Sequence, residues 1–181
     1  MPDHAREQAK QVILKIVAIS GGKLPGKLRL NKAFYAAHVI YWREHEGVLT
    51  EYPVVKLPDG PAIDDLDSLL AELETEGALE IGEEEKGPYM ETVFTLKTAV
   101  TFDPADPAYE PIRRAVQWAK KHTTSELTRL THGRPSYEAQ SRIGYEQPIY
   151  LDALSEEHIA SVRRKVREAD AAVRAALDTA R

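Results

Sequence analysis

Apolar residues recur at helical spacing through residues 27–46, and this stretch predicts the central helix of the fold. One stripe, at positions i, i+3, i+4, i+7 and i+11, consists of Leu30, Ala33, Phe34, Ala37 and Tyr41. Further apolar side chains widen the surface beyond that stripe. Because a helix that is apolar around most of its circumference is usually buried, we expect the other elements to pack around it.

Two amphipathic helices flank this segment in the sequence. Residues 7–20 carry apolar positions at helical spacing until Gly21-Gly22 ends them, and a loop then leads to the central helix. Leucines at the same spacing predict another helix from Ile63 onward, with Gly77 as its C-terminal cap. Between them, residues 48–61 contain three prolines, which predicts irregular chain or a short edge strand.

Alternating apolar and polar residues then predict a β-hairpin. Leu79 and Ile81 alternate with polar side chains, as do residues 90–96, and two glycines and a proline lie between the runs. A helix followed by a hairpin is the order found in the second half of a winged-helix unit. We therefore predict a mainly α, α+β fold: a compact helical domain with a winged-helix-like helix-plus-hairpin element.

The remaining segments extend the helical domain. Asp106-Pro107 predicts a cap for a helix to about residue 121, and Thr123 with Glu126 forms a capping box for a short helix over 125–132. After a loop-like stretch, Ser155 opens a last helix with an apolar seam. We predict one domain over 1–181, with a core of about 7–160 and the helix of 155–180 docked on it.

Composition excludes several classes of protein. The 181 residues include no cysteine, so neither a disulfide scaffold nor thiol chemistry is possible, and a structural zinc site is not expected. No apolar run has the length of a membrane span, and charges interrupt the N-terminal apolar run, unlike a secretory signal. We expect a cytoplasmic protein that does not enter membranes. Its oligomeric state stays open.

The usual catalytic constellations are missing from the sequence. The sequence contains no match to the motifs of phosphate-binding loops, dinucleotide-binding sites, zinc-protease helices or nucleophile elbows. His38 and His45 lie seven residues apart on one helical face, so they could share a metal ion. The favoured interpretation is that His38 lies at the edge of the core and that His45 is solvated near the end of the helix. His132 is a candidate base, although a capping or loop-anchoring role is preferred. We predict no enzyme, no catalytic residue, no metal and no cofactor.

Charge is segregated along the chain. Residues 62–85 hold ten of the 29 acidic residues and no lysine or arginine. Because affinity for nucleic acid comes largely from cations that neutralise phosphates, this helix and hairpin are expected to repel a duplex. They fit a docking surface for a cationic protein, or alternatively a solubilising face. The candidate partner contacts here are Asp64, Asp65, Asp67, Glu83, Glu84 and Glu85.

The glycine-rich loop and helix of residues 21–42, Gly60-Pro61 and residues 126–139 together resemble the motifs of one family, the Panacea domain family, which includes SocA-like antitoxins and phage-associated proteins. The segment GGKLPGKLRLNKAFYAAHVIYW is similar to the family's glycine, loop and helix motif, and includes Lys32 and Tyr35. Gly60-Pro61 before a helix is similar to its Y-G-P element, with Asp59 in place of tyrosine. ELTRLTHGRPSYEA is similar to its T-H-x-x-x-P-W segment; the matching positions are Thr131, His132, Pro135 and Tyr137.

The resemblance implies a non-catalytic antitoxin that neutralises a toxin encoded beside it by direct protein–protein contact. It also implies that Gly60, Pro61, Thr131, His132, Pro135 and Tyr137 serve the fold. Lys32 is the oddest residue of an otherwise apolar helix, and a structural role is favoured over a partner contact; it stays a candidate contact together with Tyr35, since exposed aromatic residues anchor interfaces.

Two other functions remain open from the sequence. A winged-helix regulator that binds DNA requires a basic face, which folding would have to assemble from Lys23, Lys27, Arg29 and Lys32 with the last helix. An adaptor that delivers a partner to a protease is the other alternative. A histidine-based enzyme ranks below both.

Overall fold

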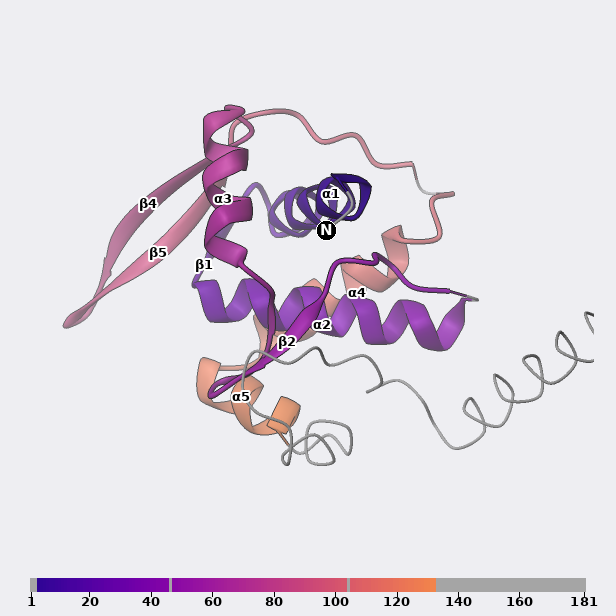
Figure 1. Ribbon diagram of the computed structural model, residues 1–181. Helices are drawn as coiled ribbons and strands as arrows, with labels where there is room; N and C mark the ends of the chain where they lie inside the picture. The colour runs from indigo at the N-terminus through magenta and orange to yellow at the C-terminus, as the bar shows by residue number, and fades with distance from the viewer. Residues whose placement is uncertain (1–2, 46, 104, 133–181) are drawn as a thin grey trace, which may run out of the picture.

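The computed structural model describes residues 3–45, 47–103 and 105–132. Five helices and five strands lie within these ranges (Figure 1). In chain order they are α1 (Asp3–Ile19), β1 (Lys23–Pro25), α2 (Lys27–Glu44), β2 (Val54–Leu57), β3 (Gly60–Ile63), α3 (Leu66–Thr75), β4 (Leu79–Lys86), β5 (Tyr89–Leu96), α4 (Tyr109–Lys121) and α5 (Thr124–His132). The predicted helical domain with a small β-hairpin is confirmed.

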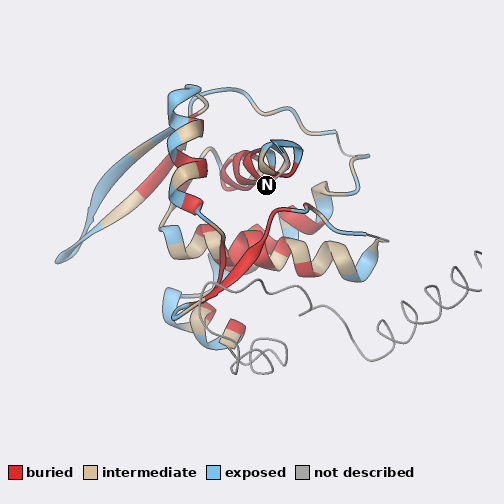
Figure 2. Ribbon diagram, viewed as in Figure 1, coloured by how far each residue is buried: buried red, intermediate tan, exposed pale blue. Residues whose placement is uncertain are grey.

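Helix α2 is the centre of the described core, as its apolar surface predicts. It packs against α1, α4, α5, β1 and β3, and its buried positions are red in Figure 2. Leu30, Ala33, Phe34 and Ala37 are completely buried. Burial of side chains on several faces of one helix is what holds the surrounding elements in fixed positions.

The β4–β5 hairpin follows α3 and projects away from the helices (Figure 1); we call it the wing. Strand β1 pairs with β5, so the antiparallel sheet has the order β1-β5-β4, with β5 in the centre and β1 and β4 at its edges. The inner half of the sheet contributes Leu24, Leu79 and Phe94 to the core. The outer half of the wing is exposed (Figure 2). The predicted winged-helix-like element is therefore present.

Residues 48–61 differ from their prediction as irregular chain or a single edge strand. Strands β2 and β3 form a second antiparallel hairpin, with Leu57 opposite Gly60 and Val54 opposite Ile63. The prolines fit because Pro58 lies in the turn and Pro61 lies in a two-stranded ribbon, where a missing donor interrupts no central ladder. Ile63 ends β3, so α3 begins at Leu66, three residues later than predicted.

Other boundaries show which local signals were sufficient. Gly77 caps α3 as predicted, with a φ of 69° and an amide that donates to the Glu74 carbonyl at 3.0 Å. Asp106 caps only the turn before α4, which begins at Tyr109 rather than at Pro107. Strand β1 lies in a segment predicted to be a loop. The prediction missed it because three residues are too few to show an alternation of apolar and polar side chains. The predicted helix of 155–180 lies outside the described residues.

Candidate functional site

Lys32 occupies the interior of the protein. Its side chain belongs to α2, and the residue is only 1% exposed. The ammonium donates hydrogen bonds to the backbone carbonyls of Asp59, at 2.6 Å, and Pro61, at 3.0 Å. Both carbonyls belong to the β2–β3 hairpin, so one side chain from the central helix fixes this hairpin in place.

Gly60 lies between those two carbonyls, where no larger residue fits. Its φ is 102°, a conformation that residues with a Cβ rarely adopt. A Cβ atom built on Gly60 would lie 2.6 Å from the Lys32 ammonium and 2.9 Å from the Thr131 hydroxyl. It would also lie 3.1 Å from a ring carbon of His132. The missing side chain is thus what allows α2, β3 and α5 to meet.

We call this meeting point the Lys32 clamp: Lys32, Asp59, Gly60, Pro61 and Thr131. Residues from all three sequence segments that carry the family resemblance lie together here, although they are far apart in the chain. The Thr131 hydroxyl is turned back to its own helix, where the carbonyls of Leu127 and Thr128 lie at 2.9 and 3.0 Å. Pro135 and Tyr137 lie outside the described residues.

The surroundings of the Lys32 ammonium disfavour its charge. Burial lowers the pKa of Lys32 from its ordinary 10.5 to about 8, and the nearby charge of Asp59 opposes this shift. The acceptors that hold the ammonium are neutral carbonyls rather than carboxylates. The Lys32 ammonium therefore holds the β2–β3 hairpin against α2, and it is not exposed at the surface where a partner could contact it. Tyr35 is likewise buried, with 5% exposure, so neither residue is a surface anchor.

The histidines do not form a metal centre within the described ranges. No group of three or more histidine and acidic side chains is suitably placed there for an ion. Burial lowers the pKa of His38 to about 4, so its imidazole is neutral near pH 7. The ring of His45 packs against Tyr41, with centroids 4.6 Å apart. His132 lies beside Gly60, and its capping or loop-anchoring role stays a prediction.

Half of the ten acidic residues in 62–85 form ion pairs with the protein's own cations. The pairs are Asp67 with Lys27, Glu72 with Arg6, Glu76 with Lys10, Glu80 with Lys97 and Glu84 with Lys23. The hydrogen bond from Arg6 is the main cause that lowers the pKa of Glu72. The sequence therefore overestimates the free negative charge, because it does not show that cations distant in the chain fold against this region.

The carboxylates of the wing differ between its two faces. Cross-strand partners share a face, so Glu83, Glu85 and Met90 lie on the face that continues outward from Ile81 and Phe94. We call these three residues the free face of the wing, since neither carboxylate has an ion pair among the described residues. On the other face, Glu84 pairs with Lys23 and Glu91 with Lys86.

Exposed apolar side chains lie at the end of the wing. Tyr89 is 76% exposed and Met90 is 57% exposed, and both follow the Gly87-Pro88 turn. Met90 is opposite Glu85 and adds apolar area beside the two carboxylates of the free face, whereas Tyr89 is opposite Lys86 and lies on the other face. Asp64 and Asp65 also lack an ion pair among the described residues, but they precede α3, at the end opposite the chain's entry into β4.

The four cations considered for a DNA-binding face are occupied elsewhere. Lys23 and Lys27 form the ion pairs with Glu84 and Asp67. The Arg29 guanidinium donates to the carbonyls of Ala119 and Pro25, both at 3.3 Å. Lys32 is buried in its clamp. Folding thus does not assemble these four side chains into a surface for phosphates.

Comparisons with protein-family models, with curated proteins and with solved structures found no match. Among the helices that the structure describes, none combines the length and the apolar character that crossing a bilayer requires.

Proposed function

We propose that this protein is an antitoxin-like binding protein of the cytoplasm that neutralises a protein toxin by direct contact, without catalysis, and that the free face of the wing contributes to the interface. The observation that carries the proposal is the combination of Glu83, Glu85 and Met90 on one exposed surface, where neither carboxylate is paired with a cation of the described residues. The resemblance of three chain segments to Panacea-type antitoxins supports the same class of function.

The chemistry of this surface favours a cationic protein as the partner. Negative carboxylates accelerate association with a positively charged surface and disfavour acidic competitors. The exposed side chain of Met90, on the same face, supplies apolar area that is buried when a complex forms. A toxin with a basic patch beside an apolar one would be complementary to both features.

The geometry disfavours the DNA-binding alternative. Helix α3 precedes the wing, in the position from which a recognition helix enters the major groove. Its sequence, LDSLLAELET, contains acidic residues and no lysine or arginine. The four candidate cations outside it are paired or buried, as described above. A duplex would therefore meet repulsion at the element expected to hold it.

Co-expression with the product of the adjacent gene tests the proposed function. We expect that product alone to arrest growth, growth to recover when this protein is present, and the two purified proteins to form a complex. An adjacent gene product that neither arrests growth nor binds would contradict the antitoxin hypothesis. Salt-sensitive binding of the upstream DNA in a gel shift would favour the regulator instead.

A charge-reversal pair tests the interface separately from the function. Glu85→Lys should weaken the complex about tenfold or more, because it replaces attraction to the cationic partner by repulsion. Glu51→Lys is the matched control: it makes the same charge change at an exposed position in the loop before β2, away from the wing. Equal affinities for the two variants would exclude the wing as part of the interface, but they would not contradict the proposal that the protein neutralises a toxin.

A further inference from the structure

Strand β4 lies at an edge of the three-stranded sheet, in the wing that projects away from the helices (Figure 1). Its outer residues, 82–86, are all exposed (Figure 2). Its inner end differs, because Leu79 is buried and the Ile81 amide donates to the Glu74 carboxylate at 3.3 Å. An exposed edge strand presents unpaired backbone N–H and C=O groups, to which another strand can add.

The hydrogen bonds of β5 show which backbone groups of β4 face outward. In an antiparallel pair, opposite residues alternately turn their backbone groups toward each other and away from each other. The Thr92 carbonyl accepts a hydrogen bond from the Gly26 amide, directly after β1, at 2.8 Å, so Thr92 turns away from β4. Glu83 is opposite Thr92 and therefore turns its N–H and C=O to the outer edge. Glu85, two residues further along, does the same.

Glu83 and Glu85 thus combine an outward-facing backbone with an unpaired carboxylate. Within the described ranges, neither residue has a hydrogen bond on the outer side of β4 or an ion pair. A second copy of the chain is disfavoured at this edge, because pairing two such edges would place the glutamates of residues 83–85 opposite one another. A strand with lysine or arginine opposite Glu83 and Glu85 would gain backbone hydrogen bonds and favourable charge pairs.

We propose that the wing binds its partner by strand addition: an extended segment of a cationic protein, with basic residues at alternate positions, pairs with the outer edge of β4. The partner's strand then becomes the fourth of the sheet, next to β4. Residues at alternate positions of a strand share a face, so the basic side chains lie on the face of Glu83, Glu85 and Met90. This inference rests on the proposed function, because it specifies how the toxin would be held.

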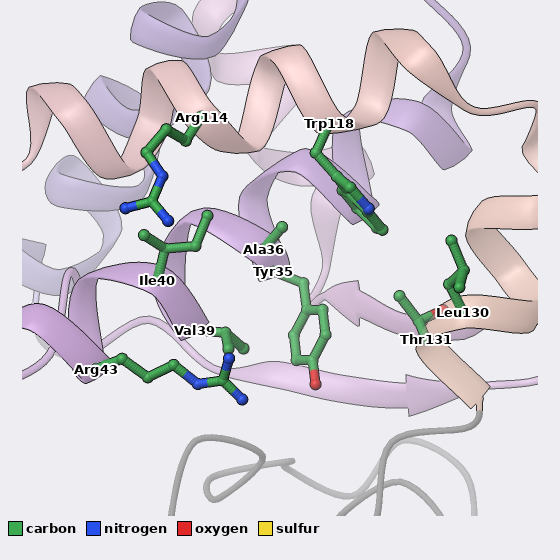
Figure 3. Close-up of a pocket in the computed structure, with 9 residues that line it drawn as sticks. All are labelled: Tyr35, Ala36, Val39, Ile40, Arg43, Arg114, Trp118, Leu130 and Thr131. Atoms are coloured by element: carbon green, nitrogen blue, oxygen red, sulfur yellow. The ribbon is translucent and has the colours of Figure 1, made fainter.

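The pocket between α2, α4 and α5 is the place where an apolar peptide side chain would bind instead. It has a volume of about 250 Å³, and Ile40, Trp118 and Leu130 contribute to its apolar wall (Figure 3). Arg43 and Arg114 also line it, so a cationic peptide is repelled there. Strand addition at the wing should therefore leave the indole N–H resonance of Trp118 unchanged.

A nuclear magnetic resonance titration of the full-length chain with the peptide acetyl-Lys-Val-Lys-Val-Lys-amide tests the proposal. The matched probe is the same peptide with N-methylated lysine residues, which keeps the charge but cannot donate backbone hydrogen bonds to β4. We expect saturable binding of the first peptide, amide exchange at Glu83 and Glu85 slowed about tenfold or more, and about tenfold weaker binding of the methylated peptide. Equal affinities of the two peptides would overturn strand addition. Absence of saturable binding, or a shift at Trp118 without protection of Glu83 and Glu85, would do the same.

Two substitutions at one position separate backbone pairing from charge. Glu85→Gln removes the charge and keeps the outward amide, whereas Glu85→Pro removes both; proline is tolerated at an edge where the N–H faces solvent. We expect the proline variant to bind the peptide about tenfold more weakly than the glutamine variant, and equal affinities would contradict backbone pairing. Toxin binding without peptide pairing would overturn strand addition and leave the proposed function intact. Peptide pairing without toxin neutralisation would support strand addition and contradict the proposed function.

Discussion

The Lys32 clamp and the wing place charge in opposite situations. In the clamp, one cation is buried and held by two neutral carbonyls, and its position admits no additional atom near Gly60. On the free face of the wing, two carboxylates are exposed and lack an ion pair within the described chain. The first arrangement fixes three elements relative to one another, whereas the second leaves charge available to another molecule.

The difference teaches that the position of a charge, rather than its sign or its rarity in the sequence, decides its role. Lys32 is conspicuous in the sequence because it interrupts an apolar helix, yet folding places it out of reach of partners. Glu83 and Glu85 are ordinary members of an acidic run, yet folding separates them from the cations that pair with their neighbours. Substitutions should therefore affect stability at the clamp and binding at the wing.

The largest effect on stability is expected from Gly60→Ala. The added methyl group would strain the backbone at a φ of 102° and collide with the Lys32 ammonium and the Thr131 hydroxyl. Left-handed strain of about 1–2 kcal/mol and overpacking of about 1–3 kcal/mol combine to a loss of about 3 kcal/mol. The free energy of unfolding, measured with urea, checks this value.

Gly82→Ala is the control for that experiment. Gly82 lies in β4, has no positive φ, and a Cβ atom there would meet nothing within 4 Å. Its substitution should change the free energy of unfolding by no more than about 0.5 kcal/mol. A comparable loss in both variants would mean that Gly60 has no special position, and the contrast between clamp and wing would fail.

The pH dependence of stability should reveal the buried ammonium. The pKa of Lys32 is about 8 in the folded protein and about 10.5 when exposed, so between these values the unfolded chain binds more protons. Stability due to this group therefore rises with pH in that window, by about 2 kcal/mol between pH 7 and pH 9.5. Below the folded pKa both states are protonated and the dependence vanishes.

Lys32→Met isolates this contribution. The variant keeps a long unbranched side chain but removes the titrating group, so its unfolding free energy should lack the rise that the unmodified protein shows between pH 8 and pH 9.5. At pH 7 it should also lose about 1–2 kcal/mol, because the carbonyls of Asp59 and Pro61 lose their donor. The same pH slope in both proteins would show that Lys32 is not the titrating group.

A smaller effect is expected at the capping box of α5. The Thr123 amide donates to the Glu126 carboxylate at 2.8 Å, and the Glu126 amide donates to the Thr123 hydroxyl at 3.3 Å. Thr123→Ala removes the second bond and should lower the free energy of unfolding by about 1 kcal/mol. Because α5 carries Thr131 to the clamp, amide exchange should quicken along this helix more than in α1; equal exchange in the two helices would contradict this reasoning.

Local patterns were sufficient to predict much of the fold. The apolar surface of α2, the Gly77 cap, the capping box and the hairpin all depend on residues a few positions apart, and each is present. Strand β1 was missed because pairing with β5 stabilises it rather than any pattern of its own. The β2–β3 hairpin was missed because its prolines are tolerated in an edge strand but are also typical of loops, and the sequence does not distinguish the two cases.

The candidate site was less predictable, because it depends on long-range contacts. No sequence pattern indicates that Lys32 meets the carbonyls of Asp59 and Pro61, or that Lys23 reaches Glu84. At the wing, the sequence does not give the strand register. The register places Glu83 and Glu85 on one face and the paired carboxylates of Glu84 and Glu91 on the other.

The smallest effect on stability is expected from charge reversal on the free face of the wing. Glu83→Lys with Glu85→Lys should change the free energy of unfolding by at most about 0.5 kcal/mol, because both side chains are exposed and neither forms an ion pair within the described residues. The same double variant should lose toxin binding. Urea unfolding and binding assays on one preparation compare the two effects directly. A stability loss as large as that of Gly60→Ala would show that the wing, like the clamp, is held by its charges, and would remove the reason to regard them as available to a partner.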